Sequence, residues 1–395
     1  MASFQAQPLQ ALLDGDPYKS IGLLGHGAYG IVDKVERRSK PGVIFARKTV
    51  RVSGPNGPSN LQTAQNEARV IRRLKHQHII SILELYTHRN ELSIIMLQVA
   101  DLDMEKYLDL ADSVTEKKQR YAIRLPMQMW PGCLIQAIDY LHEMRVKHKD
   151  LKPSNILVKD NHVLIADFGI SKDLVDEETT ASLITHRPSG TPMYMAPEVT
   201  RSSSRGRAVD IFSLGCIFLE IATVIMAAPG SLKRFSEFRE IDGHRAYSGC
   251  PMKLVQWIWH LWGYWDQYCQ LIRRRQLPYD DFLQHGAAVY DLAFLMLDPE
   301  PKTRITSRQL VSMMHARELY YRGSIKSKAC EDCGEGPVIV QSNLPLHSVY
   351  KATDNLLHPE TPEAALETNI AANWDEVKRL WLEHHMWWDS QELAE

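Results

Sequence analysis

The chain has 395 residues, of which 44% are hydrophobic and 24% charged, and its formal net charge is −2. Such a composition is average for a soluble globular protein with one large domain or two ordinary ones. The near-neutral charge argues against partners held mainly by charge, so we expect no nucleic-acid partner and no anionic membrane surface. Six cysteines are spread without a dense disulfide pattern, and residues 1–16 lack a signal-peptide pattern. We therefore expect a cytoplasmic or nuclear location.

The order of elements is read from the periodicity of the apolar residues. The predicted strands lie within 18–50, 79–86 and 92–99, and the clearest predicted helices span 60–75, 128–144 and 289–297. The pattern therefore predicts a small strand-rich part followed by a larger helix-rich part.

One stretch, residues 211–228, is almost wholly apolar. It carries Glu220 and lies between Asp210 and Pro229. This composition favours a helix buried inside a large domain over a membrane span.

A glycine-rich segment, GHGAYG, places Gly25, Gly27 and Gly30 between two strand-like runs. Glycines let the backbone approach phosphate groups and donate N–H groups to them. The same spacing also marks dinucleotide-binding folds and ordinary hairpins. Here residues 31–35 are rich in β-branched side chains. They predict a continuing strand, whereas the dinucleotide fingerprint opens a helix.

A lysine and a glutamate form the second candidate pair. Lys48 ends the strand-like sequence FARK, and Glu67 shares a helical face with Val70, Ile71 and Leu74. A carboxylate on an apolar face is costly unless it is paired, so Lys48 is its natural partner. The alternative is a surface lysine and a tolerated glutamate.

Three motifs follow in a fixed order: HKDLKPSN at 148–155, DFG at 167–169 and APE at 196–198. Phosphoryl transfer needs an oriented hydroxyl, divalent metal on the phosphates and positive charge near the transferred group. Asp150 and Lys152 offer the carboxylate and the charge. Asn155 and Asp167 offer the oxygen ligands that Mg²⁺ prefers. Motifs of this kind in this order are highly specific.

Over about residues 18–322 the sequence resembles the eukaryotic protein kinase family. The resemblance implies an α+β, two-lobed fold with a small β-rich N-lobe, a large helical C-lobe, and ATP and Mg²⁺ as cofactors. The implied limits are an extension at 1–17, an N-lobe at 18–96, a hinge at 97–103, a C-lobe at 104–322 and a tail at 323–395.

The resemblance also implies a role for each matching residue. The glycine-rich loop covers the ATP phosphates, Lys48 pairs with Glu67, and Asp150 is the catalytic aspartate. Asn155 and Asp167 are the implied Mg²⁺ ligands. The adenine is enclosed by Val32, Ala46 and Leu157, beside the gatekeeper Met96 and the hinge residues Leu97, Gln98 and Val99. The substrate-binding and structural positions are Thr191, Glu198, Asp210 and Arg304, with Arg304 as the partner of Glu198.

Two details refine this interpretation. The sequence Lys152-Pro153-Ser154 is similar to the serine/threonine branch, so the expected partner is a protein substrate with serine or threonine acceptors. Lys149 stands where the family usually has arginine, which grips a phosphorylated loop with a planar fork. Control by loop phosphorylation is therefore in doubt.

Two other classes of function compete with this one. A pseudokinase scaffold would bind nucleotide or partners without turnover, but Lys48, Asp150 and Asp167, whose loss usually marks such proteins, are all present. A small-molecule kinase of similar fold lacks an APE segment.

Further aromatic and cysteine patterns fall outside these motifs. Core packing is favoured over a partner groove for Trp257, Trp259, Trp262 and Trp265. Cys330 and Cys333 have the spacing of half a zinc site, but no second pair follows, so free thiols are favoured. We expect the tail to be partly disordered, with a helix at 369–388 that carries tryptophans and docks on the kinase domain or on a partner.

Overall fold

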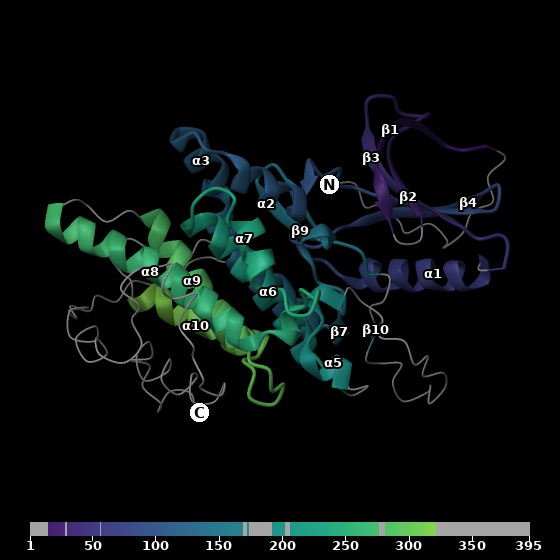
Figure 1. Cartoon of the computed structure of the whole chain (residues 1–395). Coiled ribbons are helices and arrows are strands. Elements are labelled where there is room, and N and C mark those ends of the chain that lie inside the picture. The colour runs from purple at the N-terminus through teal and green to yellow at the C-terminus, as the bar shows by residue number, and fades with distance from the viewer. Residues whose placement is uncertain are drawn as a thin grey trace. The chain divides into compact units, whose positions relative to one another are not determined.

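The computed structural model describes residues 15–27, 30–55, 57–168, 172–173, 192–201, 206–275 and 281–320 (Figure 1). It divides into two compact units. The first comprises the described parts of Met1–Tyr107 and Cys133–Gly190, and the second those of Leu108–Gly132 and Thr191–Glu395. The chain thus passes between the two units more than once. The sequence predicts instead two lobes joined by one hinge, and those lobe limits stay a prediction.

The first unit contains a five-stranded antiparallel sheet in the order β1-β2-β3-β5-β4. Its strands are β1 (Tyr18–Gly27), β2 (Gly30–Arg37), β3 (Ile44–Arg51), β4 (Ile82–His88) and β5 (Glu91–Met96). Helix α1 (Gly57–Arg73) connects β3 to β4. The predicted strand-rich beginning is therefore confirmed.

Helix α1 begins earlier than the periodicity predicts. Gly57 approaches the backbone so closely that an added Cβ would lie 2.3 Å from the carbonyl oxygen of Val52. Pro58 follows at the start of the helix, where a missing N–H costs no hydrogen bond. The sequence around Gly57 resembles a loop, which explains why the pattern alone places the start too late.

Both faces of the sheet are packed. Ala64 and Ala68 of α1 pack with Val50, Leu92 and Ile94 on one face. A second cluster combines Tyr18, Val35, Phe45, Tyr86 and Ile95. The alternation of side chains along each strand sends successive residues to opposite faces, so one strand contributes to both clusters.

Shorter elements complete the first unit. They are β6 (Leu102–Asp103), β7 (Val146–Lys147), the 3-10 turn η2 (Pro153–Asn155), β8 (Ile156–Lys159), β9 (His162–Ile165) and β10 (Lys172–Asp173). Strands β6, β8 and β9 form a three-stranded sheet, and β7 pairs with β10. The loop between β7 and β8 and the residues after β9 therefore belong to one compact unit.

The second unit is helical in its described part. Helices α2 (Met104–Ser113) and α4 (Trp130–Glu143) each begin in one unit and end in the other. The remaining elements are α3 (Lys117–Arg124), η1 (Leu125–Gln128), η4 (Pro192–Tyr194), α5 (Pro197–Arg201), α6 (Ala208–Met226), α7 (Ser231–Phe238), η5 (Tyr247–Gly249), α8 (Pro251–Arg275), α9 (Asp281–Met296) and α10 (Ser307–Tyr320).

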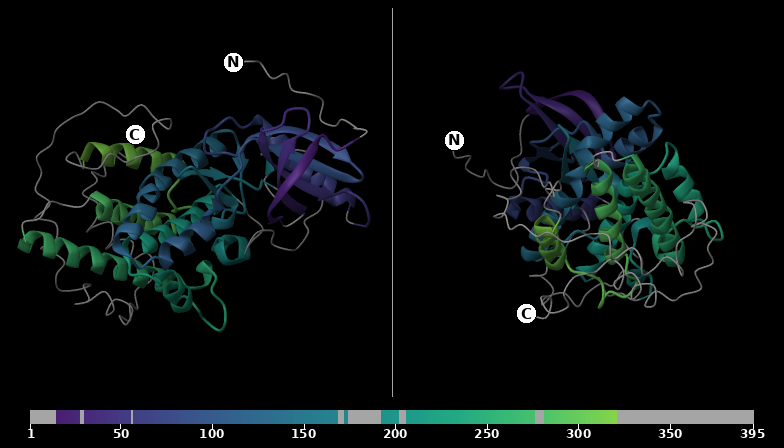
Figure 2. Two further views of the ribbon diagram at one scale, coloured as in Figure 1. Left: turned by 90° about the horizontal axis from the view of Figure 1, so that it is seen from above. Right: turned by 90° about the vertical axis from the view of Figure 1, so that its left-hand side faces the viewer.

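Helix α6 is the core of this unit. It packs against α7, α8 and α9, the last two drawn in green in Figure 2. Gly215 permits the contact with α9, because an added Cβ would lie 2.8 Å from the Cβ of Met296. By length and composition α6 is long and apolar enough to cross a membrane, but all of its most apolar stretch is buried inside the protein. The predicted buried helix is confirmed.

The tryptophans of α8 contribute to the same core. Trp257, Trp259 and Trp262 are buried, and the indole N–H of Trp257 donates to the hydroxyl of Thr223 at 2.9 Å. Core packing is therefore confirmed for these three residues. The Cys330–Cys333 pair and the whole tail at 323–395, including the predicted helix at 369–388, lie outside the described residues.

Candidate functional site

Lys48 of β3 holds two carboxylates. Its Nζ lies 2.8 Å and 2.9 Å from the two carboxylate oxygens of Glu67, and 3.0 Å from Oδ1 of Asp167. The register of the sheet places Lys48 opposite Val32 on β2 and Ile94 on β5. The structure therefore brings together a strand, helix α1 and the segment after β9 at one ammonium group.

The charges of this cluster are coupled: burial and the neighbouring Asp167 raise the pKa of Glu67 above its usual value, although Lys48 opposes this. Burial opposes the charge on Lys48, but the carboxylates of Glu67 and Asp167 outweigh it and raise the pKa of the lysine above its usual value. Burial also opposes ionisation of Asp167, yet the charge and hydrogen bond of Lys48 hold the pKa of that carboxyl below its usual value. At neutral pH the cluster therefore has one cation and an ionised Asp167.

Asp167 is held in an uncommon backbone conformation. Its φ is 60° and that of Lys149 is 71°, both in the left-handed region that favours glycine. Such strain persists where the surroundings over-determine it, and it gathers at functional sites. Phe168 is fully buried, and its ring lies 4.8 Å from that of His148. The buried phenyl ring therefore anchors the segment that carries Asp167.

The loop between β7 and β8 is fastened to this segment. The N–H of Ala166 donates to the carbonyl of Asn155 at 2.9 Å, and Nε2 of His148 lies 3.0 Å from the carbonyl oxygen of Ala166. Within the loop, Nζ of Lys152 lies 3.1 Å from Oδ2 of Asp150. The amide nitrogen of Asn155 donates to the backbone carbonyl of Asp150 at 2.8 Å and to Oδ2 at 3.1 Å. Asp150, Lys152 and Asn155 thus form one connected group.

The donor set fits a magnesium ion that is bound together with a phosphate-bearing ligand. Among the described residues no group of three or more His, Cys, Asp and Glu could hold a metal by itself. Mg²⁺ typically binds one or two carboxylates and completes its shell with phosphate oxygens and water. The amide nitrogen of Asn155 is used by Asp150, so its amide oxygen is the atom suited to a hard cation. Asn155 and Asp167 would therefore hold the metal, as the sequence predicts.

The three glycines of the glycine-rich segment have different surroundings. Gly30 begins β2, and an added Cβ would lie 1.9 Å from the carbonyl oxygen of Thr49 on β3. Gly25 has open space around it and pairs with Val32, while Gly27 pairs with Gly30. Gly30 is therefore required by the packing of the sheet, independently of any ligand.

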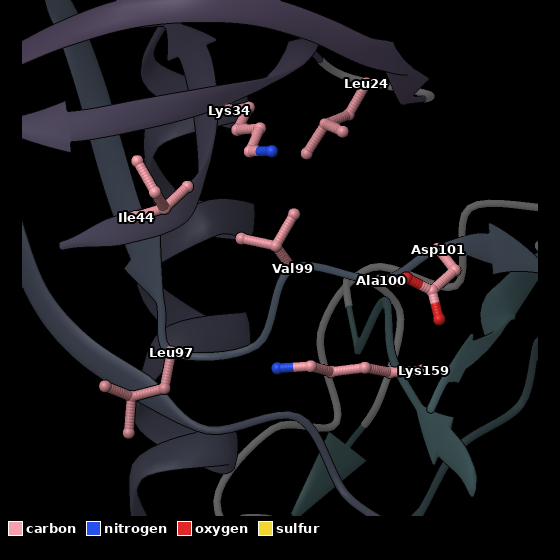
Figure 3. Close-up of a pocket in the computed structure, with 8 residues that line it drawn as sticks. All are labelled: Leu24, Lys34, Ile44, Leu97, Val99, Ala100, Asp101 and Lys159. Carbon is pink, nitrogen blue, oxygen red and sulfur yellow. The ribbon is translucent and has the colours of Figure 1, made fainter. Parts of the chain in front are cut away.

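A cavity of about 310 Å³ opens beside residues 97–101 (Figure 3). It is lined by Leu24, Lys34, Ile44, Leu97, Val99, Ala100, Asp101 and Lys159. The lysines Lys34 and Lys159 extend into it from different elements, β2 and β8. The N–H of Leu97 donates to the carbonyl of Ser81 at 3.0 Å, so that donor is already used.

The cavity contains only part of the predicted adenine-binding set. Leu97 and Val99 line it, whereas Val32, Ala46, Met96 and Leu157 do not. Ala46 pairs with Met96 across β3 and β5, and Leu157 pairs with Leu164 across β8 and β9. The sequence motifs do not predict Lys34 and Ile44, which line the cavity. Each lies two positions from a predicted residue on the same strand, Val32 on β2 and Ala46 on β3. The period of two along a strand could have identified both.

The predicted substrate-side residues lie in the second unit. Arg304 forms a two-pronged ion pair with Glu198, at 2.7 Å and 2.9 Å, and its side chain has no exposed surface. Asp210, in the first turn of α6, is also buried. Thr191 lies outside the described residues.

Comparison with known proteins agrees with this arrangement. The model of the protein kinase domain matches residues 18–315. Calcium/calmodulin-dependent protein kinase type 1 of Macrobrachium nipponense is 34% identical over 206 residues, which are 51% of this chain and 55% of that protein. The serine/threonine-protein kinase fused of Drosophila melanogaster is 31% identical over 51% of this chain and 24% of its own length. The serine/threonine-protein kinase TIO of Arabidopsis thaliana is 31% identical over 52% of this chain and 14% of its own.

The chain belongs to the protein kinase family, since the family model covers most of its length. Its match spans about half of the first of these relatives and a smaller part of the other two.

Proposed function

We propose that this protein transfers the γ-phosphate of ATP to serine and threonine hydroxyls of protein substrates. The observation that carries the proposal is the cluster in which Lys48 is bound by Glu67 and Asp167. Two contacts of Ala166 link that cluster to the group around Asp150: its N–H donates to the carbonyl of Asn155, and its carbonyl oxygen lies 3.0 Å from Nε2 of His148. Phosphoryl transfer depends on positioning and on charge stabilisation, and these residues supply both.

Each residue has a defined task in this reaction. Asp150 orients the acceptor hydroxyl and accepts its proton as the oxygen attacks the γ-phosphorus and the bond to ADP breaks. Lys152, 3.1 Å from Asp150, adds positive charge near the transferred group. Lys48, oriented by Glu67, reaches the phosphates. Asn155 and Asp167 would hold Mg²⁺, which would supply charge neutralisation on the phosphate oxygens.

The direct test compares wild type with Asp150→Asn in a radiolabel transfer assay on a generic protein substrate. We expect transfer by wild type and none above background by the variant. A wild-type protein that binds nucleotide but transfers no phosphate would establish the scaffold alternative instead.

The acceptor residue is a separate prediction. Lys152 and Ser154 match the serine/threonine branch, so phosphoserine and phosphothreonine are the expected products. Phosphoamino-acid analysis of the labelled substrate measures this directly. Mainly phosphotyrosine would contradict the assignment to the branch.

The tail and the location are also proposals. We propose that the tryptophan-containing segment at 369–388 docks on the kinase domain or on a partner protein, since its aromatic residues are better buried than exposed. Replacing Trp381 and Trp388 by alanine in the full chain should change kcat or abolish capture of a partner. A cytoplasmic or nuclear location is supported by Cys133, Cys216 and Cys250, which are free and buried in the described part. Imaging of the tagged protein tests it.

A further inference from the structure

Tyr194 precedes the APE motif and is fixed at two atoms by one helix. Its hydroxyl donates to Oε1 of Glu220 at 2.9 Å, and its carbonyl accepts from the hydroxyl of Ser213 at 2.9 Å. Ser213 and Glu220 lie about two turns apart on α6, which places them on one face of the helix. The segment 192–195 is therefore anchored to the central helix of its unit through one tyrosine side chain and one carbonyl.

Glu220 is itself held by a second tyrosine. The hydroxyl of Tyr247 in η5 donates to the same Oε1 at 2.6 Å. The rings of Tyr194 and Tyr247 stack with their centroids 5.5 Å apart. Tyr247 has no exposed surface, and Glu220 is 9% exposed. A carboxylate this deeply buried remains charged only when hydrogen bonds and a nearby cation compensate for its lost hydration.

Arg239, at the end of α7, packs against Tyr247. Its guanidinium carbon lies 3.7 Å from the centre of the Tyr247 ring and 4.6 Å from that of Phe235. One of its terminal nitrogens donates to the carbonyl of Arg245. Burial disfavours the charge, but Tyr247 and Glu220 outweigh it and raise the pKa of Arg239 above its usual value. The arginine therefore remains charged inside the core, where its guanidinium packs on the ring of Tyr247, the residue whose hydroxyl donates to Glu220.

We propose that Arg239 and Tyr247 are positioning residues for the protein substrate. Tyr247, which packs against the Arg239 guanidinium, orients Glu220 through its hydrogen bond, and Glu220 in turn fixes Tyr194 and the segment 192–195 against α6. This inference rests on the proposed function, because that segment resembles the substrate-binding segment of protein kinases. Neither residue belongs to a catalytic motif.

The kinetic consequence is selective. Tyr247→Phe removes one hydrogen bond from Glu220 and keeps the ring, so we expect the KM for a peptide substrate to rise about three- to tenfold. The KM for ATP and the kcat should stay within about twofold. Arg239→Met should raise the peptide KM further, and Arg239→Lys, which keeps the charge, should recover part of the loss. Tyr290→Phe is the matched control, since Tyr290 is a buried tyrosine of the same unit on a different helix, α9.

A second measurement does not depend on turnover. Amide hydrogen exchange, followed by mass spectrometry of full-length protein, should accelerate at residues 192–199 in Tyr247→Phe and Arg239→Met, and not in Tyr290→Phe. If wild type transfers no phosphate, the proposed function fails while this exchange pattern still decides the positioning role. Unchanged exchange at 192–199 overturns the inference, and so does a uniform acceleration across the unit. In active enzyme, equal changes in the KM values for ATP and peptide also overturn it.

Discussion

The two units each contain a buried ion pair on a predicted functional residue, and the two pairs are built differently. In the first unit the ammonium of Lys48 is shared by two carboxylates, and the Asp167 side chain is 30% exposed. In the second unit Arg304 meets one carboxylate, that of Glu198, and its side chain has no exposed surface. Arg304 also donates to the carbonyls of Asp298 and Ala208, each at 2.7 Å.

The difference separates a site that can bind a ligand, at Lys48, from an ion pair with a structural role, at Arg304. One cation between two carboxylates leaves negative charge that a metal ion can neutralise, and a flexible lysine adjusts to its partners. A guanidinium fork with four hydrogen bonds and no exposed surface is closed to a ligand, but it fixes backbone segments with directed hydrogen bonds. The presence of a cation paired with a carboxylate does not distinguish these roles. The number of partners and the exposed fraction of the side chains do.

The largest expected effect separates chemistry from binding within the first unit. Asp150→Asn should lower kcat by a factor of about 10²–10⁴, because proton transfer is lost, and should leave nucleotide affinity nearly unchanged. Asp167→Asn should weaken Mg²⁺-dependent nucleotide binding as well. Steady-state kinetics and nucleotide titration with and without Mg²⁺ measure both. Near wild-type turnover in Asp150→Asn would contradict the catalytic assignment.

The second effect concerns stability in the second unit. Arg304→Met removes the buried ion pair of Glu198, so the free energy of unfolding should fall by about 3–5 kcal/mol. Denaturant titration of the purified variant measures it. The matched control is Arg245→Met, whose pair with Glu240 is about 40% exposed on each side; its loss should cost less than about 1 kcal/mol. Equal losses in the two variants would remove the distinction drawn above.

Much of the first cluster was predictable because its residues stand in ordered motifs. Periodicity located α1, and the costly carboxylate on its apolar face identified Glu67 as the partner of Lys48. The DFG and HKDLKPSN motifs indicated Asp167 and Asp150. The motifs could not indicate how the two loops are joined. Ala166 contacts both Asn155 and His148, and both contacts use backbone atoms, which every residue carries.

The network beneath Tyr194 was not predictable from the sequence. Its members come from four separated elements, η4, α6, the end of α7 and η5, and only Tyr194 lies in a motif. The sequence pattern identifies Glu220 only as an acid inside an apolar stretch, which favours a buried helix over a membrane span. Its role depends on Tyr247 and Arg239 reaching the same place, and that requires the path of the chain between α6 and α8. The apolar periodicity of the chain between α6 and α8 does not predict that Arg239 and Tyr247 lie next to each other or that Tyr247 contacts Glu220.

A smaller effect tests the pairing of Lys48 with Glu67. Each single substitution, Lys48→Met and Glu67→Gln, should lower kcat/KM for ATP. The double variant should lose much less than the sum, with a coupling energy of about 1–3 kcal/mol, because both substitutions break one interaction. Additive losses in this cycle would mean that the 2.8 Å contact is not functionally coupled.

The smallest effect is expected from phosphorylation of the segment 171–189. That segment contains the hydroxyl residues Thr179, Thr180, Ser182, Thr185 and Ser189, all outside the described residues. Its first strand, β10, pairs with β7, which leads into Lys149. A phosphate orders a loop best when an arginine fork receives it, whereas Lys149 offers one compact charge. The acids of the segment, Asp173, Asp176, Glu177 and Glu178, already provide negative charge.

We therefore expect the unphosphorylated enzyme to be active and loop phosphorylation to raise kcat by less than about tenfold. The measurement is kcat after phosphatase treatment, with mass spectrometry to confirm that the loop is bare. Lys149→Arg is the informative variant, because a fork at this position should increase the response to the phosphate while basal activity stays similar. A loss of two or more orders of magnitude on dephosphorylation, restored by rephosphorylation, would show that Lys149 serves as well as arginine. The site of the first unit would then need phosphorylation of its own loop, and the cluster of Lys48, Glu67 and Asp167 alone would not be enough for activity.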